Sequence, residues 1–280
     1  MDVRGLLKQY DLRPSKGLGQ NFLVNQAILG KIAAAAELTA DDTVLEIGAG
    51  LGTLTEQLAR SAGRVVAVEL DERLLPVLQD TLPKFENVTL VQGDILELDP
   101  AKLIEPAVHY KVVANLPYYI TSAVLRHLLE ASLKPLRLVI TVQREVAERI
   151  VARPGEMSLL AVSVQFYGRP QILFRIQPGS FYPSPGVESA VVQVDICDAP
   201  SVAIEDADAF FRVVKAGFAQ RRKQLRNTLA GGLRLPPKEI EAKLHAISVD
   251  PKRRAETLSL EEWARIAQML TDEKPRPSDV

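Results

Sequence analysis

Short apolar runs alternate with amphipathic stretches along the first part of the chain. Runs rich in Val, Ile and Leu predict buried strands at residues 43–47, 64–68, 88–91, 111–114 and 138–142. Apolar residues at helical spacing predict helices at 25–38, 53–62 and 122–131, and one after Asp71 with a kink or a late start at Pro76. Strands that alternate with helices favour a parallel sheet covered on both faces. Residues 1–24 are mixed in character and are expected to be loop-like.

The pattern changes after Pro154. A helix at 158–167 is expected to precede two strands, 172–176 and 190–196, which form a hairpin across a Pro- and Gly-rich bend. From about residue 199 the pattern is helical, with helices predicted at 206–218, 223–229 and 237–246, and a last one, opened by a Ser259–Glu262 capping box, that ends near Leu270. We therefore predict a catalytic domain at 1–198, a helical domain at 199–272 and a disordered tail at 273–280.

The composition is that of an ordinary globular protein, with 47% hydrophobic and 25% charged residues among 280. The single cysteine, Cys197, cannot form an internal disulfide, and the three histidines show no metal-ligand spacing. These features predict a cytoplasmic protein without a structural metal. No membrane association is expected, since the first residues lack the apolar core of a signal peptide and no apolar run is long enough to cross a bilayer.

A glycine-rich loop, Glu46-Ile-Gly48-Ala-Gly50-Leu-Gly52, follows the first strand and opens a helix. Such loops also bind dinucleotides, so the loop alone is weak evidence. Here, however, Thr53 stands where the dinucleotide fingerprint has its third glycine. The Glu46 carboxylate would repel a pyrophosphate, whereas it suits a cationic ligand that carries a sulfonium and an ammonium group. We therefore expect S-adenosylmethionine.

Two further acids are predicted at the carboxyl ends of neighbouring strands. Glu69 stands 21 residues after Gly48, the spacing at which an acid accepts hydrogen bonds from ribose hydroxyl groups. Asp94 ends the next strand and could accept a hydrogen bond from the 6-amino group of the cofactor's adenine. A single acid at such a position is more often a solvated loop residue. Three acids at successive strand ends, together with the glycine loop, favour a cofactor site.

The sequence Asn115-Leu116-Pro117-Tyr118 follows the predicted strand at 111–114. The Asn115 side chain offers a carbonyl oxygen to an N–H donor, Pro117 stiffens the turn, and Tyr118 offers a flat face for a base. By itself this sequence is equally consistent with a plain strand-to-loop turn. Together with the expected methyl-donor site, it predicts a site that binds a planar amino group.

The net charge of −1 conceals a basic segment. Residues 212–226 contain six cations and no acid. A charge run is often just the solvated face of a helix, but this concentration favours phosphate binding. The residues expected to bind RNA are Arg221, Arg222, Lys223 and Arg226, with Arg253 and Arg254 as a weaker second group.

The chain resembles the small-subunit ribosomal RNA adenine N6-dimethyltransferases from about Arg13 to Leu270. The resemblance is carried by the loop at 46–52, Glu69 and the 115–118 sequence, and by Gly19-Gln20-Asn21-Phe22-Leu23, Gly93-Asp94, Ser180-Phe181-Tyr182-Pro183-Ser184-Pro185 and Phe218-Ala-Gln220-Arg221-Arg222-Lys223. It implies an α/β fold: a Rossmann-like methyltransferase sheet of mostly parallel strands, the last antiparallel, with a small all-helical C-terminal domain. The chain departs from the family at two positions. It has Gly186 where the family often has Lys, and Glu188 where the family often has Asp.

The resemblance also implies a reaction and its residues. The substrate would be two adjacent adenosines in a hairpin loop near the 3′ end of 16S rRNA within the small ribosomal subunit, and the protein would act as a monomer. Asn115, Leu116 and Tyr118 would hold the target base, and Phe181 would stack on it. The residues expected to bind the cofactor are Gln20, Asn21, Leu23, Glu46, Gly48, Gly50, Gly52, Glu69, Leu70, Asp94, Ile95 and Asn115.

Two other functions remain open at this stage. A methyltransferase that modifies one adenine of 23S rRNA and confers antibiotic resistance would share both pockets, although the 218–223 segment and the Leu116/Tyr119 variant favour the small-subunit enzyme. A non-catalytic ribosome-assembly or transcription factor could use the same fold. Such a factor would not need Asn115 or the glycine loop, yet both are intact.

Overall fold

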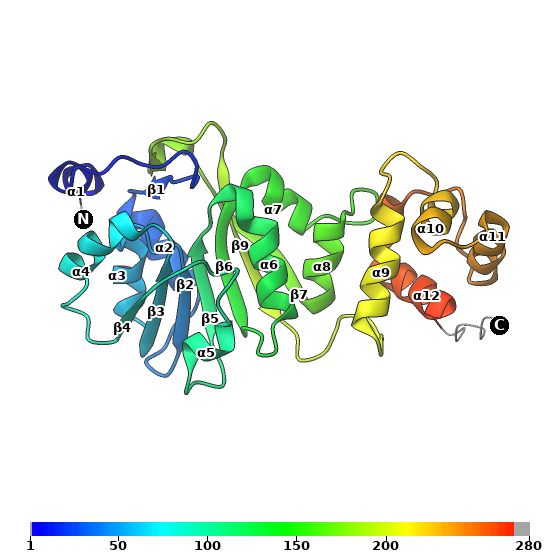
Figure 1. The fold of residues 1–280 in the computed structure, drawn as a ribbon, viewed down its shortest axis with the longest axis horizontal. Coiled ribbons are helices and arrows are strands. Elements are labelled where there is room, and N and C mark those ends of the chain that lie inside the picture. The colour runs from blue at the N-terminus through cyan, green and yellow to red at the C-terminus, as the bar shows by residue number, and fades with distance from the viewer. Residues whose placement is uncertain (1, 272–280) are drawn as a thin grey trace, which may run out of the picture. The chain divides into compact units, whose positions relative to one another are not determined.

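The computed structural model describes residues 2–271, and contacts between them divide the chain into two compact units (Figure 1). The first unit contains residues up to Glu148 and Arg169–Ile196, and the second contains Arg149–Gly168 and the residues from Cys197 onward.

A seven-stranded sheet of order β4-β3-β2-β5-β6-β9-β7 forms the centre of the first unit. The strands from β4 to β6 pair in parallel, and β9 pairs antiparallel with β6. This confirms the predicted sheet of mostly parallel strands with a late antiparallel one. The strands are β2 (Thr43–Ile47), β3 (Arg64–Glu69), β4 (Val88–Gln92), β5 (Lys111–Asn115), β6 (Arg137–Gln143), β7 (Gly168–Ile176) and β9 (Ser189–Ile196).

Both faces of the sheet are covered near its centre. Every residue of β2 is buried, although successive side chains of a strand point to opposite faces. Residues of the edge strand β4 are only partly buried or exposed. The helices of this unit are α1 (Val3–Gln9), α2 (Gln26–Ala35), α3 (Thr53–Ala59), α4 (Leu75–Thr81), α5 (Pro100–Ile104) and α6 (Thr121–Glu130), and α7 (Arg144–Ile150) leads into the second unit.

Capping side chains mark where helices begin. The Asn25 side chain accepts hydrogen bonds from the N–H groups of Ala27 and Ile28, as its predicted capping role requires. Asp71 caps a short 3₁₀ turn (Glu72–Leu74), after which α4 begins with Pro76 in its first turn. The late start predicted for Pro76 is therefore confirmed, because proline is tolerated only where no backbone N–H is needed.

The prediction that residues 1–24 are loop-like is wrong. They contain α1 and the short strand β1 (Phe22–Leu23), which pairs antiparallel with β8 (Phe181–Tyr182) in a separate two-stranded sheet. Val3 and Leu7 of α1 pack in one cluster with Leu51, Leu74 and Val77. Since all of these partners are distant in sequence, no local pattern identified the helix. The short helices α5 and α7 were also missed.

The second unit is helical. It contains α8 (Leu159–Tyr167), α9 (Ala207–Phe218), α10 (Leu225–Leu233), α11 (Pro237–Ala246) and α12 (Leu260–Thr271). Trp263, Phe166 and Phe210 are fully buried in its core, and the rings of Phe166 and Phe210 stack at 4.8 Å. The predicted capping box is present, since Ser259 N–H donates to Glu262 and Glu262 N–H donates to the Ser259 hydroxyl.

The contact division differs from the predicted catalytic domain 1–198 in one segment. Residues 149–168 belong to the second unit because the apolar side of α8 packs on α9 in the second core. The second change of unit falls between Ile196 and Cys197, close to the predicted boundary. The predicted tail, 273–280, lies outside the described residues.

No helix within residues 2–271 is long and apolar enough to cross a membrane. Within the same range, no group of three or more His, Cys, Asp or Glu side chains could hold a metal ion.

Candidate active site

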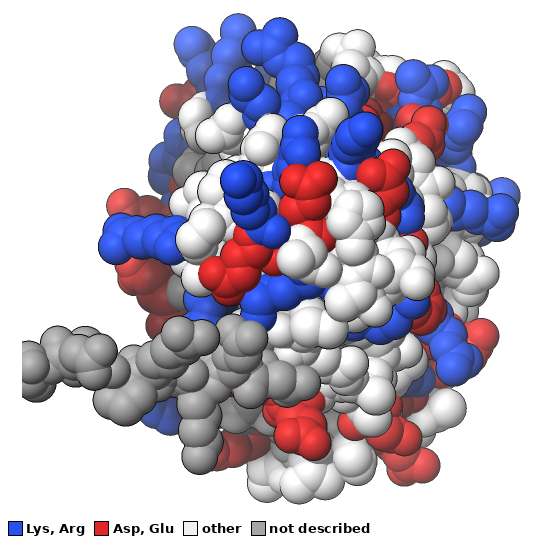
Figure 2. All heavy atoms as spheres, turned by 90° about the vertical axis from the view of Figure 1, so that its right-hand side faces the viewer, with Lys and Arg blue, Asp and Glu red and all other residues white. Residues whose placement is uncertain are grey.

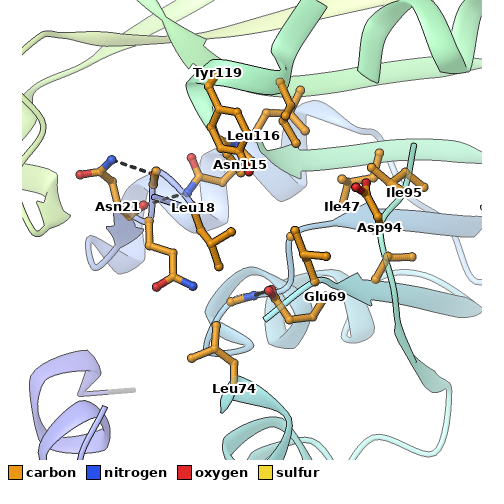
Figure 3. Close-up of a pocket in the computed structure, with 18 of the residues that line it drawn as sticks. Leu18, Asn21, Ile47, Glu69, Leu74, Asp94, Ile95, Asn115, Leu116 and Tyr119 are labelled. Atoms are coloured by element: carbon orange, nitrogen blue, oxygen red, sulfur yellow. Dashed lines mark hydrogen bonds between the residues drawn. The ribbon is translucent and has the colours of Figure 1, made fainter. Parts of the chain in front are cut away.

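A pocket opens at the carboxyl ends of β2, β3, β4 and β5, where ligands bind in open α/β sheets (Figure 3). The N-terminal segment 18–22 and the residues that directly follow these strands supply its walls. It is lined by Leu18, Gly19, Gln20, Asn21, Phe22, Ile47, Gly48, Gly50, Val68, Glu69, Leu70, Leu74, Gly93, Asp94, Ile95, Asn115, Leu116, Pro117, Tyr118, Tyr119 and Ile120.

The glycine loop has a backbone that other residues adopt only with strain. Gly48, Gly50 and Gly52 have φ values of +77°, +60° and +79°. A Cβ atom on Gly50 would lie 3.3 Å from the Phe22 ring, so a side chain there would also crowd the neighbouring wall. The loop is fixed to β3, since the N–H groups of Gly48 and Ala49 both donate to the Val68 carbonyl, at 2.9 and 3.1 Å.

Glu69 joins the glycine loop to the turn after β3. Its Oε2 accepts a hydrogen bond from Gly50 N–H at 2.7 Å, and its Oε1 accepts one from Asp71 N–H at 2.8 Å. Burial raises the pKa of Glu69, and these two backbone hydrogen bonds oppose the rise. A carboxylate offers about four acceptor positions, so Glu69 retains capacity for hydroxyl donors on the pocket side.

Asp94 lies at the far end of the pocket, beside Ile95 and Ile47 (Figure 3). Its Oδ1 accepts a hydrogen bond from Leu96 N–H at 2.9 Å, which fixes the side chain. Within the described part of the chain, Oδ2 has no hydrogen-bond donor. The pocket therefore presents a free carboxylate oxygen between apolar side chains.

Asn115 lies at the end of β5 and faces the N-terminal segment (Figure 3). Its amide Nδ2 donates to the Asn21 carbonyl at 3.1 Å, and the Asn21 side chain in turn donates to the Gly19 carbonyl at 3.0 Å. Because the amide nitrogen is held in this way, the side-chain oxygen Oδ1 is left as the free end. Among residues 2–271, no donor occupies it.

The next residues complete this wall. Leu116 is buried and its N–H donates to the Thr141 carbonyl at 3.2 Å, while its own carbonyl accepts no hydrogen bond from any described residue. The hydroxyl group of Tyr118 lies 2.7 Å from that of Ser189. Burial raises the pKa of Tyr118, and the hydrogen bond to Ser189 opposes the rise. Tyr119 lies at the rim with 59% of its surface exposed.

Gln20 contributes to the pocket wall, but both ends of its side chain are already hydrogen-bonded. Its Oε1 accepts from Ser15 N–H and its Nε2 donates to Asp71, each at 2.7 Å. It therefore fastens the N-terminal segment to the turn after β3. The apolar lining residues Leu18 and Leu74 were not predicted, because nothing in a lone leucine indicates a ligand.

The structure brings most of the predicted cofactor and base residues together, but four predicted residues are absent from the pocket wall. Leu23 and Phe181 lie in a hydrophobic core cluster, where Phe181 is 4% exposed. Gly52 turns away towards α4, since a Cβ there would meet Leu78 and Leu82. None of these three residues lines the pocket.

Glu46 is the fourth of these residues. Only 1% of its surface is exposed, and neither carboxylate oxygen has a hydrogen-bond partner among the described residues. Burial raises the pKa of Glu46 to about 8, with a smaller contribution from the charge of Glu69. Glu46 does not line the pocket, so its predicted contact with a cationic ligand stays a prediction.

The basic segment lies in the second unit. Arg221, Arg222 and Lys223 are exposed in the turn between α9 and α10, and none of them has an ion-pair partner within residues 2–271. Figure 2 shows a face on which Lys and Arg side chains gather along the upper edge. Arg226 instead pairs with Glu241 at 2.9 Å, and Arg253 is held by Glu262 and Thr257. We name residues 221–223 the basic turn.

Residues 13–272 match a family model described as "Ribosomal RNA adenine dimethylase". "Ribosomal RNA small subunit methyltransferase A" of Dehalococcoides mccartyi is 47% identical over 271 residues, which cover 96% of this chain and 93% of that protein.

Two solved structures have similar folds. The crystal structure of the 23S rRNA methyltransferase ErmE is 28% identical, with a TM-score of 0.71 and coverage of 90% of this chain and all of that one. A dimethyladenosine transferase from Plasmodium falciparum is 23% identical, with a TM-score of 0.74 and coverage of 88% and 95%. At that identity the second likeness concerns the fold alone.

Proposed function

Because the chain belongs to the ribosomal RNA adenine dimethylase family, we propose that it methylates N6 of two adjacent adenosines in a hairpin loop near the 3′ end of 16S rRNA. The methyl donor is S-adenosylmethionine, and the substrate is the immature small ribosomal subunit. One observation carries the proposal. The free Asn115 oxygen and the free Leu116 carbonyl lie on the wall of a pocket whose other side presents Glu69 and Asp94.

The hydrogen-bond acceptors of the pocket fit S-adenosylmethionine. Glu69 has acceptor capacity for ribose hydroxyls, and the free oxygen of Asp94 suits an adenine amino group between Ile47 and Ile95. The open backbone at Gly48 and Gly50 allows close approach of the rest of the molecule. The cofactor supplies an electrophilic methyl group on a sulfonium.

The residues of the 115–118 turn prepare the nucleophile. The 6-amino group of adenine is a poor nucleophile because its lone pair is delocalised into the ring. The Asn115 oxygen and the Leu116 carbonyl each accept a hydrogen bond from one of its N–H groups. These two hydrogen bonds bias the nitrogen towards pyramidal geometry and direct its lone pair into the pocket. Positioning of this kind supplies most of the acceleration in a displacement reaction. The methylated aminium product loses a proton to water, which leaves the nitrogen with a lone pair and one N–H group. The second methyl transfer therefore starts from a nitrogen held by a single acceptor hydrogen bond.

The target base must leave its stack to reach this turn. Tyr118 lines the pocket and offers an aromatic face, and a base–aromatic stack is worth about 1–3 kcal/mol. Phe181 was expected to form the opposite wall, but its ring lies in the core, so this role stays a prediction. The basic turn binds phosphates of the rRNA outside the pocket.

The small-subunit substrate is favoured over the large-subunit one. The relative named for the small subunit is 47% identical to this chain, against 28% for the 23S rRNA methyltransferase. A purely non-catalytic assembly factor is disfavoured, because it would have no use for the three positive-φ glycines and the free Asn115 oxygen.

Mapping of methylated nucleotides tests the proposal. The protein is incubated with labelled S-adenosylmethionine and with small subunits from cells that lack this modification, with large subunits as the matched control. We expect dimethylation of two adjacent adenosines near the 3′ end of 16S rRNA, found by mass spectrometry. Label in 23S rRNA alone would support the large-subunit alternative, and no label in either RNA would support a non-catalytic role.

A further inference from the structure

A hydrogen bond ties the aromatic wall of the pocket to a distant strand. The hydroxyl groups of Tyr118 and Ser189 lie 2.7 Å apart, although the two residues are 71 positions apart in sequence. Tyr118 begins a short 3₁₀ turn (Tyr118–Ile120) directly after Pro117, so its backbone is held close to β5. Its phenol end is therefore held separately, by β9.

Ser189 is an unusual residue for its place. It is 0% exposed and begins β9, whose next residues Ala190, Val191 and Val192 are buried and apolar. A hydroxyl group buried without a hydrogen bond destabilises the fold, so a serine at such a place needs a partner. Within the described residues, that partner is the Tyr118 hydroxyl.

The sheet fixes the distance between this anchor and Asn115. Ser189 pairs with Gln143 at the end of β6, and Thr141 of the same strand pairs with Asn115 on β5. Ser189 on β9 and Asn115 on β5 are therefore separated by a single strand, β6. Movement of the hydroxyl end of the Tyr118 ring away from β9 therefore requires loss of the hydrogen bond to Ser189.

We propose that Ser189 is a positioning residue, which fixes the hydroxyl end of Tyr118 and so keeps the ring where it can stack on the target adenine beside Asn115. The inference rests on the proposed function and deepens it. It gives a residue that does not line the pocket a role in placing the aromatic ring. Ser189 itself does not contact the base. A Tyr118 side chain without this anchor would stack less often on the extruded adenine and weaken RNA binding in the ground state and the transition state alike.

A double-mutant cycle tests this inference. Ser189→Ala removes the hydroxyl at one end of the hydrogen bond and Tyr118→Phe removes it at the other, while the aromatic ring is retained. Each variant should raise the KM for undermethylated small subunits about three- to tenfold and change kcat less than about twofold, as expected for lost uniform binding. The double variant should be no worse than either single one, because all three lack the same interaction.

A spectroscopic measurement accompanies the kinetics. A hairpin RNA with 2-aminopurine in place of the first target adenosine reports whether the base stacks in the pocket. Both single variants should show less fluorescence quenching on binding than the wild type. Their affinity for S-adenosylmethionine should stay within about twofold of the wild type, because the bond lies on the base side of the pocket.

The outcomes separate the inference from the function. A Ser189→Ala variant with wild-type KM and quenching would overturn the inference alone, and so would additive effects in the cycle. A wild-type protein that neither methylates small subunits nor quenches the hairpin would overturn the proposed function, and this inference with it. Equal, non-additive effects in an active enzyme would support both.

Discussion

Asn115 combines a held amide nitrogen with a free carbonyl oxygen, and this division of one side chain is the basis of the proposed chemistry. The hydrogen bond to the Asn21 carbonyl also assigns the orientation of the amide group, since only the nitrogen can donate. The N-terminal segment therefore decides which end of Asn115 faces the substrate.

Asn115→Ala should lower turnover at least about tenfold without unfolding the protein, because it removes one acceptor for the substrate amino group. Turnover is measured on undermethylated small subunits, and stability by thermal unfolding. Asn25→Ala is the matched control: it removes a helix cap and should lower the stability by about 1 kcal/mol with little effect on turnover. Near-normal turnover of Asn115→Ala would contradict the assignment.

We expect the buried Glu46 carboxyl group to make the free energy of unfolding depend on pH. Its pKa in the folded protein is about 8, against an ordinary value of 4.5. Because the folded state binds the proton more tightly than the unfolded state, the stabilisation is fully present below the ordinary pKa and is lost as the pH rises through the folded one.

The free energy of unfolding of the wild type should therefore fall by about 1–3 kcal/mol between pH 6 and pH 9 because of this group. For Glu46→Gln the fall over the same pH range should be smaller by about 1–3 kcal/mol. Urea unfolding of both proteins at the two pH values measures the difference. Parallel pH profiles of the wild type and the variant would show that Glu46 ionises normally in the fold.

At the scale of elements, the glycine loop between β2 and α3 joins three parts of the site. It is bonded to Val68 and Glu69 on β3, and it lies against Phe22 of β1. The backbone conformation of this loop, more than any of its side chains, shapes the cofactor side of the pocket.

Gly50→Ala should weaken S-adenosylmethionine binding by about tenfold or more, because alanine is strained at a φ of +60° and its Cβ would lie 3.3 Å from the Phe22 ring. Calorimetric titration measures the affinity. Gly30→Ala in α2 is the matched control, since nothing lies within 4 Å of a Cβ there. That variant should bind normally and gain up to about 1 kcal/mol of stability.

At the scale of the whole molecule, charge and chemistry are divided between the two compact units. The pocket belongs entirely to the first unit, and the basic turn to the second. The net charge of −1 shows nothing of this division, because acids elsewhere balance the basic segment. RNA binding and methyl transfer should therefore respond to different substitutions.

Neutralising Arg221, Arg222 and Lys223 to Gln should weaken binding to small subunits and make its salt dependence shallower by up to about three counterions. Filter binding over a series of salt concentrations measures the slope. The control neutralises three exposed cations of the first unit, Lys31, Lys102 and Arg126, and should leave the slope nearly unchanged. An unchanged slope in the basic-turn variant would exclude these residues from the RNA interface.

Much of this molecule could be read from local sequence. The strand at 43–47 and the helix at 237–246 are found within their predicted bounds, and Asn25 and Ser259 form the predicted caps. The spacing of apolar residues and the capping of helices are local properties, because they depend on residues that are close together in the chain. Glu69, Asp94 and Asn115 line one pocket, because the carboxyl ends of parallel strands share one edge of the sheet, whereas Glu46 does not line it.

The tertiary structure alone decided the rest. The sequence could not show that α1 packs on Leu74 and Val77, that Asn21 orients the Asn115 amide, or that Ser189 holds Tyr118. Each of these contacts joins residues far apart in the chain. The sequence determined the chemical groups of the site and the sheet edge that presents them. Burial and long-range hydrogen bonds decided which groups face the pocket and, in the case of Glu46, how tightly the carboxyl group holds its proton.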